Sequence, residues 1–338
     1  MSKGGRVIGQ GAYGCAYKPA MRCSGETAPR DGVSKLMVQE EADKEWNEVK
    51  ALRETVDPTM KYTVYPISRC EPRREPSAAE LSEENAAGKC SVRGANTLIV
   101  SPDGGMRLDK VPDGSPSAFA RSVGNLYLGL VALHTYSLVH HDIKGDNVLV
   151  KGGVARYIDF GMSTNLRNMY PDTAGVARYT AKRGFPGFAS SHLPPDWWFL
   201  QGDFDGGKTY TDVRMIQNAM RIHMEEYGND AVHVHKVDDS YLVLLGEIYK
   251  WTCKNPREAA KAVDVFQLGR LCLSLDTQFP PEPRLRALWK HMMDRDPRKR
   301  PTAEQAFREY QSIVAIPPPV PLVPAAAPKM CGIPGDSV

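Results

Sequence analysis

Residues 140–147 read HHDIKGDN, and a DFG tripeptide follows at residues 159–161. The carboxylate of Asp142 can accept or orient the proton of an attacking hydroxyl group. The amide oxygen of Asn147 and the carboxylate of Asp159 are hard oxygen ligands of the kind that suits Mg²⁺. The spacing of these polar residues favours a catalytic site that uses a metal ion.

The flanking segments place these residues on loops. Aliphatic and aromatic residues dominate residues 117–138, which predicts a long and mostly buried helix ahead of the motif. Residues 148–160 hold two short apolar runs separated by two glycines, which predicts a hairpin. We therefore expect Asp142 and Asn147 between the helix and the hairpin, and Asp159 directly after the second strand.

A second motif lies near the N-terminus, where residues 6–17 read RVIGQGAYGCAY. Glycine lets backbone N–H groups approach phosphate oxygens because no Cβ is in the way. A dinucleotide-binding fingerprint of similar spacing opens a helix, whereas Pro19 argues against a helix here. A glycine-rich hairpin that covers phosphates is the better interpretation, and its candidate binding residues are Gly9, Gln10, Gly11, Ala12, Gly14 and Ala16.

Lys35 lies in a short apolar run at residues 33–38, which predicts a strand. A lysine that binds phosphates needs an acidic partner to hold it in place. Residues 40–54 show apolar residues at helical spacing among charged ones. Glu48 in this helix is the expected partner of Lys35, and Glu45, one turn earlier, is the alternative.

The C-terminal half carries three more short motifs, which are LPPD at 193–196, DVFQLG at 264–269 and RPT at 300–302. Apolar spacing predicts helices over 258–275, 282–294 and 301–314. Strands therefore dominate the first part of the chain and helices the second, an order typical of an α+β fold.

Taken in this order, the motifs resemble those of the protein kinase superfamily, over roughly residues 6–312. The resemblance implies an α+β, bilobal fold, with a small β-rich N-lobe at 1–103 and a larger helical C-lobe at 104–314. It also implies that Asp196 and Arg300 form a structural ion pair.

The resemblance implies that ATP binds in a cleft with Mg²⁺ or Mn²⁺, and that its γ-phosphoryl group passes to a Ser or Thr hydroxyl of a protein substrate. Asn147 and Asp159 would hold the metal. Asp142 would orient the hydroxyl as the catalytic base, and Lys144 would steady the phosphoryl group. A lysine two residues after the catalytic aspartate is similar to the serine/threonine form of this loop.

The resemblance also assigns the nucleotide contacts. Lys35, held by Glu48, would bind the α- and β-phosphates beneath the glycine-rich hairpin. Val33 and Ala16 would cover the adenine, and the segment from Ser101 to Gly104 would act as the hinge that binds adenine through its backbone. The nucleotide-binding residues beyond the hairpin are therefore Val33, Lys35, Ser101 and Asp103. Three residues resemble the internal packing spine of the family, namely Leu52, His140 and Phe160.

His141 stands where the family has an arginine that anchors a phosphorylated activation loop. An imidazole is mostly neutral at pH 7 and is a poorer phosphate partner. The sequence therefore predicts weak or no dependence of activity on phosphorylation of the loop hydroxyls, which are Thr173, Thr180, Ser190 and Ser191.

A narrower resemblance links the chain to kinases of large nucleocytoplasmic DNA viruses. The residues that carry it are 11–23, the VSKL run at 33–36, the PDGG turn at 102–105 and the PPD element at 194–196. It implies a virus-encoded enzyme that acts in the host cytoplasm or is packaged in virions.

Three segments fall outside the kinase pattern. Residues 68–96 are rich in Pro, Glu, Ser and Arg and predict an exposed loop insertion. Residues 201–260 lengthen the region after Asp196 and form either a structural helical pair or a docking site for a partner. The tail at 315–338 is rich in Pro and Ala and is expected to be disordered, with a second docking site as the alternative.

Composition narrows the remaining possibilities. With 338 residues, 42% hydrophobic, and a net charge of +3, the chain can bury a core and lacks the excess charge of a nucleic-acid-coating protein. Seven cysteines without a C-x-x-C pair predict free thiols in a reducing compartment. No apolar run reaches 18 residues, so we expect a cytoplasmic protein that binds neither nucleic acid nor membrane.

Two other functions fit parts of the sequence. A pseudokinase would keep the fold as a binding or scaffold module, although such proteins usually lose the lysine or one of the two aspartates that this chain keeps. A small-molecule kinase of related fold would usually lack a lysine at position 144.

Overall fold

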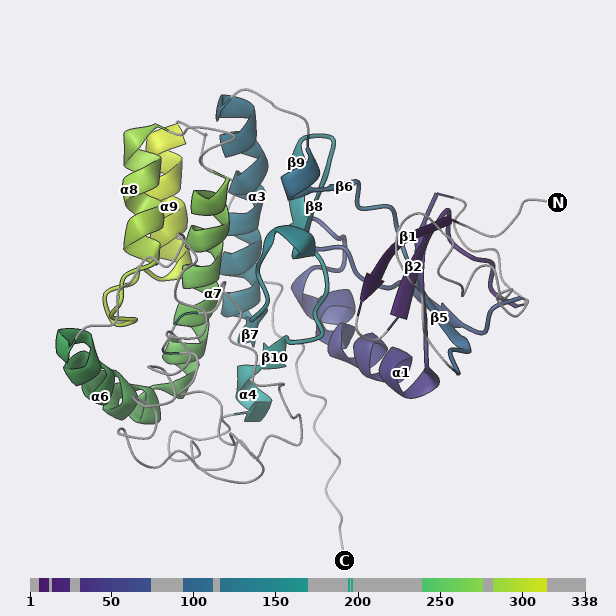
Figure 1. Ribbon diagram of the computed structural model, residues 1–338, viewed down its shortest axis with the longest axis horizontal. Coiled ribbons are helices and arrows are strands. Elements are labelled where there is room, and N and C mark those ends of the chain that lie inside the picture. Colours follow the sequence, from purple (N-terminus) through teal and green to yellow (C-terminus); the bar gives the residue numbers. More distant parts are fainter. Residues whose placement is uncertain are drawn as a thin grey trace, which may run out of the picture.

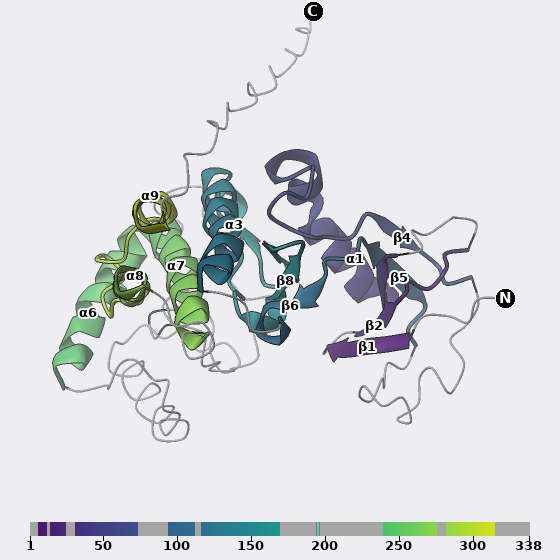
Figure 2. The same cartoon turned by 90° about the horizontal axis from the view of Figure 1, so that it is seen from above.

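The computed structural model describes residues 6–11, 14–24, 31–73, 94–111, 116–169, 194, 196, 239–275 and 282–314. Within these ranges it is a mixed structure of helix and sheet, and strands come before most of the helices, as the sequence predicts. In both views the first strands and α1 lie at one end of the long axis and the long helices at the other (Figures 1 and 2).

The N-terminal part is an antiparallel sheet of five strands in the order β1-β2-β3-β5-β4. Its strands are β1 (Arg6–Gly11), β2 (Gly14–Lys18), β3 (Val33–Met37), β4 (Ser68–Cys70) and β5 (Thr97–Ser101). β5 is buried on both faces, with Ile99 packed against Ala42 of α1. On β2 and β3, alternate side chains such as Tyr17 and Leu36 are buried on the other face. This alternation is the period-2 pattern of a half-buried sheet.

One helix, α1 (Gln39–Glu48), packs near β5 and ends earlier than the sequence predicts. The expected helix over 40–54 is interrupted at Val49, and a π-helix, η1 (Leu52–Val56), follows. Val49, Leu52 and Val56 are all buried in the main core. The π-helical turn, which is wider than an α-helical turn, therefore lies in a buried segment. Packing in the core, and not the helical spacing of the sequence, determines where α1 ends.

A smaller sheet of three strands joins the N-terminal sheet to the helices (Figure 1). It consists of β6 (Met106–Arg107), β8 (Val148–Lys151) and β9 (Val154–Tyr157), and the predicted hairpin is its β8–β9 pair. Short elements surround it, namely η2 (Leu108–Lys110), β7 (Leu138–Val139), η3 (Gly145–Asn147), β10 (Thr164–Asn165) and α4 (Leu166–Met169). β7 pairs with β10, so the chain before HHDIKGDN lies beside the chain after DFG.

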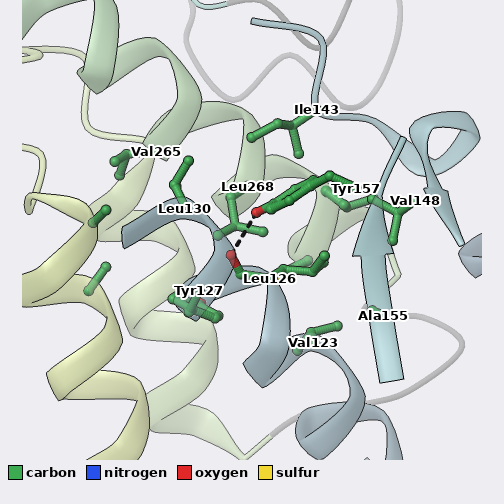
Figure 3. Packing of buried hydrophobic residues seen from close by; sticks show 14 of the residues in the cluster. Val123, Leu126, Tyr127, Leu130, Ile143, Val148, Ala155, Tyr157, Val265 and Leu268 are labelled. Atoms are coloured by element: carbon green, nitrogen blue, oxygen red, sulfur yellow. Dashed lines mark hydrogen bonds between the residues drawn. The ribbon is translucent and has the colours of Figure 1, made fainter. Parts of the chain in front are cut away.

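Four of the five described helices at the other end confirm the sequence prediction within a few residues, whereas no helix was predicted over residues 239–254. The five helices are α3 (Pro116–Thr135), α6 (Asp239–Lys254), α7 (Pro256–Ser274), α8 (Pro283–Met292) and α9 (Ala303–Val314). α3 packs against α7, α9 and β9. Figure 3 shows this core, where the Tyr157 hydroxyl donates a hydrogen bond of 2.9 Å to the Leu126 carbonyl across it. No helix among the described residues is both long and apolar enough to cross a bilayer.

Part of the region after Asp196 belongs to the buried core of the protein. Of residues 201–260, the described part begins at 239, and Leu245 and Ile248 of α6 are fully buried. Ala259 and Ala260 of α7 are buried as well. This part of the segment therefore packs in the core, whereas residues 201–238, residues 74–93 of the insertion predicted at 68–96, and the tail at 315–338 lie outside the described residues.

The expectation of free thiols is wrong for three of the cysteines, which are Cys15, Cys23 and Cys70. Cys23 and Cys70 form a disulfide with a Cα–Cα separation of 5.6 Å, which is ordinary for such a bond. Backbone hydrogen bonds run alongside it, from Ser24 to Glu71 and from Arg73 to Arg22, each 2.8 Å. Cys15 is also disulfide-bonded, while Cys272 is a buried free thiol. Sequence spacing missed the pair because 47 positions separate its members.

We expect Cys70→Ser to lower the free energy of unfolding by about 2–4 kcal/mol, because the disulfide restricts the unfolded chain over a long loop. Cys70 is only partly buried, so little packing is lost with the sulfur. Denaturant unfolding under oxidising conditions measures the difference. The matched control is the same comparison in reductant, where both proteins lack this bond and should unfold alike; a difference that persisted there would assign the effect to packing.

Candidate active site

The backbone of the HHDIKGDN loop is hydrogen-bonded to a buried carboxylate of α7. Asp264 accepts hydrogen bonds from the backbone N–H of His140 at 2.8 Å and of His141 at 2.7 Å, and His134 Nε2 lies 3.1 Å from the same carboxylate. Burial alone would raise the pKa of Asp264, but the hydrogen bond from His134 and the nearby His141 outweigh it, and the pKa lies below its usual value. The loop is therefore fixed to α7 by an ionised aspartate.

A second residue of α7 completes this support. The Gln267 amide donates to the carbonyl of His141 at 3.0 Å and accepts from the backbone N–H of Ile143 at 3.2 Å. The roles of Gln267 and His134 were not predicted from the sequence, because their partners lie more than 120 positions away in the chain. Gln267 lies within the DVFQLG motif, but nothing in that motif indicates that its amide binds the HHDIKGDN loop.

The side chain of His141 lies inside the protein. It is almost fully buried, and its Nε2 lies 3.2 Å from the carbonyl of Ala260 in α7. Burial lowers the pKa of His141 below its usual value, so the ring is neutral at pH 7. A neutral ring that is bound to α7 cannot anchor a phosphate group, which agrees with the sequence interpretation of this position.

Asp142 is the centre of a compact polar cluster. Lys144 Nζ lies 2.9 Å from both carboxylate oxygens of Asp142. The Asn147 amide nitrogen donates to Asp142 Oδ2 at 2.6 Å and to its backbone carbonyl at 2.9 Å. The structure thus brings together three of the predicted site residues, and η3 supplies the turn that lets Asn147 fold back onto Asp142.

Asp159 follows β9 and is brought beside this cluster by the backbone. The N–H of Ile158 donates to the carbonyl of Asn147 at 3.0 Å. Asp159 is solvent-exposed and has a left-handed backbone with φ of 59°, an uncommon conformation for a residue other than glycine. Strain of this kind is found most often at functional sites.

Phe160 and His140 connect the two motifs on the buried side. Their ring centroids lie 4.7 Å apart, and Phe160 is buried in the same core cluster as Leu52. The N–H of Asp142 lies 3.3 Å from His140 Nδ1, and His140 Nε2 lies 3.1 Å from the carbonyl of Ile158. Nδ1 therefore accepts and Nε2 donates. The ring joins the HHDIKGDN loop to the DFG segment directly.

The oxygen ligands suit a metal that arrives with a nucleotide. The Asn147 amide uses its nitrogen to bind Asp142, which leaves its oxygen as the ligand atom, and Asp159 adds an exposed carboxylate. The described residues contain no cluster of three His, Cys, Asp or Glu side chains that would hold an ion alone. Mg²⁺ is commonly bound by one or two protein oxygens and completed by water and phosphate, so the pair fits Mg²⁺.

Lys35 is paired with a different glutamate from the expected one. Its Nζ lies 2.6 Å from Glu45 Oε2, so the assignment of Glu48 as the partner is corrected to Glu45. Burial alone would lower the pKa of Lys35, but Glu45, Asp159 and, more weakly, Glu48 outweigh it and raise the pKa. Burial raises the pKa of Glu45. Lys35 therefore stays charged and lies within the field of Asp159.

The glycine-rich hairpin is formed as predicted by β1 and β2. Gly9 pairs with Ala16, and Gly11 pairs with Gly14 across the turn. A Cβ on Gly14 would lie 2.6 Å from the carbonyl of Leu36, so any larger residue would push β2 away from β3. Ala16 pairs with Lys35, which places β2 of the hairpin directly beside the lysine strand β3. Gln10 belongs to β1, and Ala12 lies outside the described residues.

The predicted hinge runs from the end of β5 into β6. Ser101, the last residue of β5, pairs with Val33, the first residue of β3. Gly105 has φ of 96°, and a Cβ there would lie 2.0 Å from the carbonyl of Val150. Glycine is thus required where the hinge passes against β8. The Asp103 side chain binds Lys18 at 2.8 Å, a contact that sequence analysis did not foresee.

The ion pair expected between the PPD element and RPT is present. Arg300 binds Asp196 through two nitrogens, at 3.0 Å and 2.5 Å, and both side chains are almost fully buried. The guanidinium also donates to the carbonyls of Asp294 and Ala262 and lies 4.9 Å from the centre of the Phe266 ring. Arg300 thus joins three segments of the helical part.

Comparison with known proteins finds partial similarities. No model of a known protein family matches the chain. Mitogen-activated protein kinase kinase kinase 15 of Mus musculus is 36% identical over 115 residues, which cover 28% of this chain and 8% of that protein. Serine/threonine-protein kinase ppk6 of Schizosaccharomyces pombe is 40% identical over 67 residues, covering 20% of this chain and 8% of that protein. Myosin-IIIb of Mus musculus is 30% identical over 166 residues, which cover 47% of this chain and 12% of that protein.

The chain therefore spans about a tenth of the length of these curated relatives. Several of the similar proteins are named as protein kinases, including mitogen-activated protein kinase kinase kinases and a serine/threonine-protein kinase. At this coverage and identity, the similarities support a place in the protein kinase superfamily.

Proposed function

We propose that this chain, given its similarity to serine/threonine protein kinases, is itself a protein kinase with a two-lobed fold and ATP in the cleft between the lobes. The observation that carries the proposal is the Asp142–Lys144–Asn147 cluster beside Asp159. All four residues keep the identities that phosphoryl transfer requires. A module that only bound nucleotide would not need a lysine and an amide fixed onto an aspartate carboxylate.

In this mechanism the chain works by positioning and electrostatics. The carboxylate of Asp142 orients a Ser or Thr hydroxyl and accepts its proton as the oxygen attacks the γ-phosphorus. The bond between the γ-phosphorus and the bridging oxygen breaks, and ADP leaves. Lys144, held 2.9 Å from Asp142, neutralises charge on the transferring group. Asn147 and Asp159 would hold Mg²⁺ or Mn²⁺, which supplies charge neutralisation at the β- and γ-phosphates.

On the nucleotide side, Lys35 binds the α- and β-phosphates and is kept in place by Glu45. The glycine-rich hairpin covers the phosphates from β1 and β2 with Gly9, Gln10, Gly11, Ala12 and Gly14. Ala16 and Val33 cover the adenine, and the backbone from Ser101 to Asp103 binds its edge. Protein substrates with exposed Ser or Thr follow from the names of the similar proteins.

The direct test is transfer of phosphate from γ-labelled ATP to basic and acidic protein acceptors, with Mg²⁺ or Mn²⁺. We expect label on phosphoserine and phosphothreonine, lost on chelation of the metal and in an Asp142→Asn protein purified in parallel. Binding of ATP without any transfer would instead identify a pseudokinase. Transfer to sugars or other small molecules, with none to proteins, would identify a small-molecule kinase.

The pairing of Lys35 gives a prediction that separates two neighbouring glutamates. Glu45→Gln should lower kcat/KM by about 10–100-fold. Without Glu45, Lys35 is no longer held in place, and a displacement of a substrate-positioning group by about 1 Å can reduce the rate by this factor. Glu48→Gln should cost much less, since Glu48 contributes only a weak part of the field at Lys35. Steady-state kinetics with ATP as the varied substrate measures both. A larger loss from Glu48→Gln would restore Glu48 as the partner.

The buried His141 gives a prediction about regulation. Changing Thr173, Thr180, Ser190 and Ser191 together to Ala should leave at least half of the activity, because no ring at position 141 is placed to bind a loop phosphate. The measurement is the initial rate of the phosphatase-treated wild type beside that of the fourfold variant. If the variant melted like the wild type but had lost its activity, the loop hydroxyls would be required after all.

A further inference from the structure

Two lysines from different sheets converge on the hinge aspartate. Lys18 lies at the end of β2 in the five-stranded sheet, and Lys151 lies at the end of β8 in the three-stranded sheet. Lys18 Nζ is 2.8 Å from Asp103 Oδ1. Lys151 Nζ donates to the Asp103 carbonyl at 3.0 Å and lies 3.6 Å from Oδ2. One residue of the hinge is therefore bound from both sides.

The carboxylate is well suited to this role. Its side chain is 18% exposed, whereas those of Lys18 and Lys151 are 41% and 55% exposed. Asp103 Oδ1 also accepts the N–H of Gly105 at 3.1 Å, which fixes the carboxylate to the turn. Burial alone would raise the pKa of Asp103, but the hydrogen bonds from Lys18 and Gly105 and the charge of Lys151 lower it. The carboxylate is ionised and preorganised for two cations.

The two lysines belong to the strands that frame the proposed nucleotide site. β2 carries Gly14 and Ala16, pairs with the strand of Lys35, and is half of the hairpin that is proposed to cover the phosphates. β8 begins directly after Asn147, and its hairpin partner β9 leads to Asp159. The distance between the hairpin cover and the metal ligands therefore depends on how β2 and β8 are held at the hinge. In Figure 1, β6 and β8 lie between the helices and the first strands.

We propose that Lys18, Asp103 and Lys151 form an ionic latch that fixes the spacing of the nucleotide cover and the metal-binding side of the site. Asp103 is then a positioning residue, and its side chain acts through the two lysines. This inference rests on the proposed function, and it adds Lys18 and Lys151 to the residues that set affinity for nucleotide. The reacting groups themselves are not altered by the latch, so it should govern ATP affinity more than the transfer step.

Individual pairs with exposed lysines are weak, so the expected effects are modest. Lys18→Met and Lys151→Met should each weaken binding of ATP·Mg²⁺ by about two- to fivefold, the range for a partly exposed ion pair. The turnover number of each should stay within experimental error of the wild type. In an Asp103→Asn background, Lys18→Met should cost nothing further, because its partner charge is already gone. The matched control is Lys261→Met, whose ion pair with Glu258 lies within one helix.

The experiment combines ATP·Mg²⁺ titration by calorimetry, steady-state kinetics, and hydrogen–deuterium exchange of the nucleotide-free proteins. The latch predicts faster exchange in β2 and β8 for Lys18→Met, Lys151→Met and Asp103→Asn, and no change for Lys261→Met. Unchanged affinity and unchanged exchange in all three variants would overturn it. A loss confined to kcat would overturn it as well. If the wild type bound no nucleotide, the proposed function would fail, and the exchange data alone would then decide the latch.

Discussion

Asp142→Asn should reduce the rate of phosphate transfer by about 10²–10⁴-fold, the usual contribution of a positioned general base. The substitution keeps the size of the side chain but removes the carboxylate that accepts the proton. Lys144 and the Asn147 amide both donate to this carboxylate, so the amide oxygen of the variant can still accept from one of them. The loop should therefore keep its shape while the proton acceptor is lost.

The measurement is single-turnover transfer from labelled ATP, beside thermal melting with and without ATP·Mg²⁺. We expect the variant to melt near the wild-type temperature and to be stabilised by ATP·Mg²⁺ to a similar extent. A variant that folds, binds ATP and still transfers phosphate at more than a tenth of the wild-type rate would exclude Asp142 as the base. A variant that failed to fold would be replaced by Asp142→Ser, with the same readouts.

Arg300→Met should lower the free energy of unfolding by about 3–5 kcal/mol, because it leaves the Asp196 carboxylate buried without its partner. The loss includes two further hydrogen bonds, to the carbonyls of Asp294 and Ala262. Lysine should not rescue the site, since a single ammonium cannot reproduce the two parallel bonds of the guanidinium.

Denaturant unfolding of Arg300→Met, Arg300→Lys and Arg308→Met provides the test. Arg308 pairs with Glu304 on the exposed face of α9, and its loss should cost no more than about 0.5 kcal/mol. The double variant Asp196→Asn/Arg300→Met should be more stable than Arg300→Met alone, because the uncompensated charge is removed. If Arg300→Met and Arg308→Met lowered the free energy of unfolding equally, the buried Asp196–Arg300 pair would contribute no more to stability than an exposed pair.

The parts of the fold that follow local periodicity could be predicted from the sequence. The β8–β9 hairpin, α3 and the three C-terminal helices lie within a few residues of their predicted bounds. The Asp142 cluster was also predictable, because all of its members lie within six residues and one short turn brings them together. Local sequence contains the information that such features need.

Contacts between distant segments could not be predicted in the same way. Glu45 and Glu48 lie three positions apart on one face of a helix, so periodicity cannot choose between them as partners of Lys35. The choice depends on how α1 packs on the sheet and on the break at Val49. Two other contacts also depend on segments that meet only in the folded protein. They are the Cys23–Cys70 bond and the hydrogen bonds between Asp264 and the HHDIKGDN loop.

The Cys23–Cys70 bond closes a covalent ring, and this ring contains Lys35 and Glu45. A protease that cuts the backbone once between the two cysteines opens the ring but releases no fragment, since the sulfur bridge still joins both sides. A nicked molecule would migrate as one species on a gel without reductant and separate into two pieces only after reduction. The segment that contains Lys35 is thus tethered to the rest of the chain at two points.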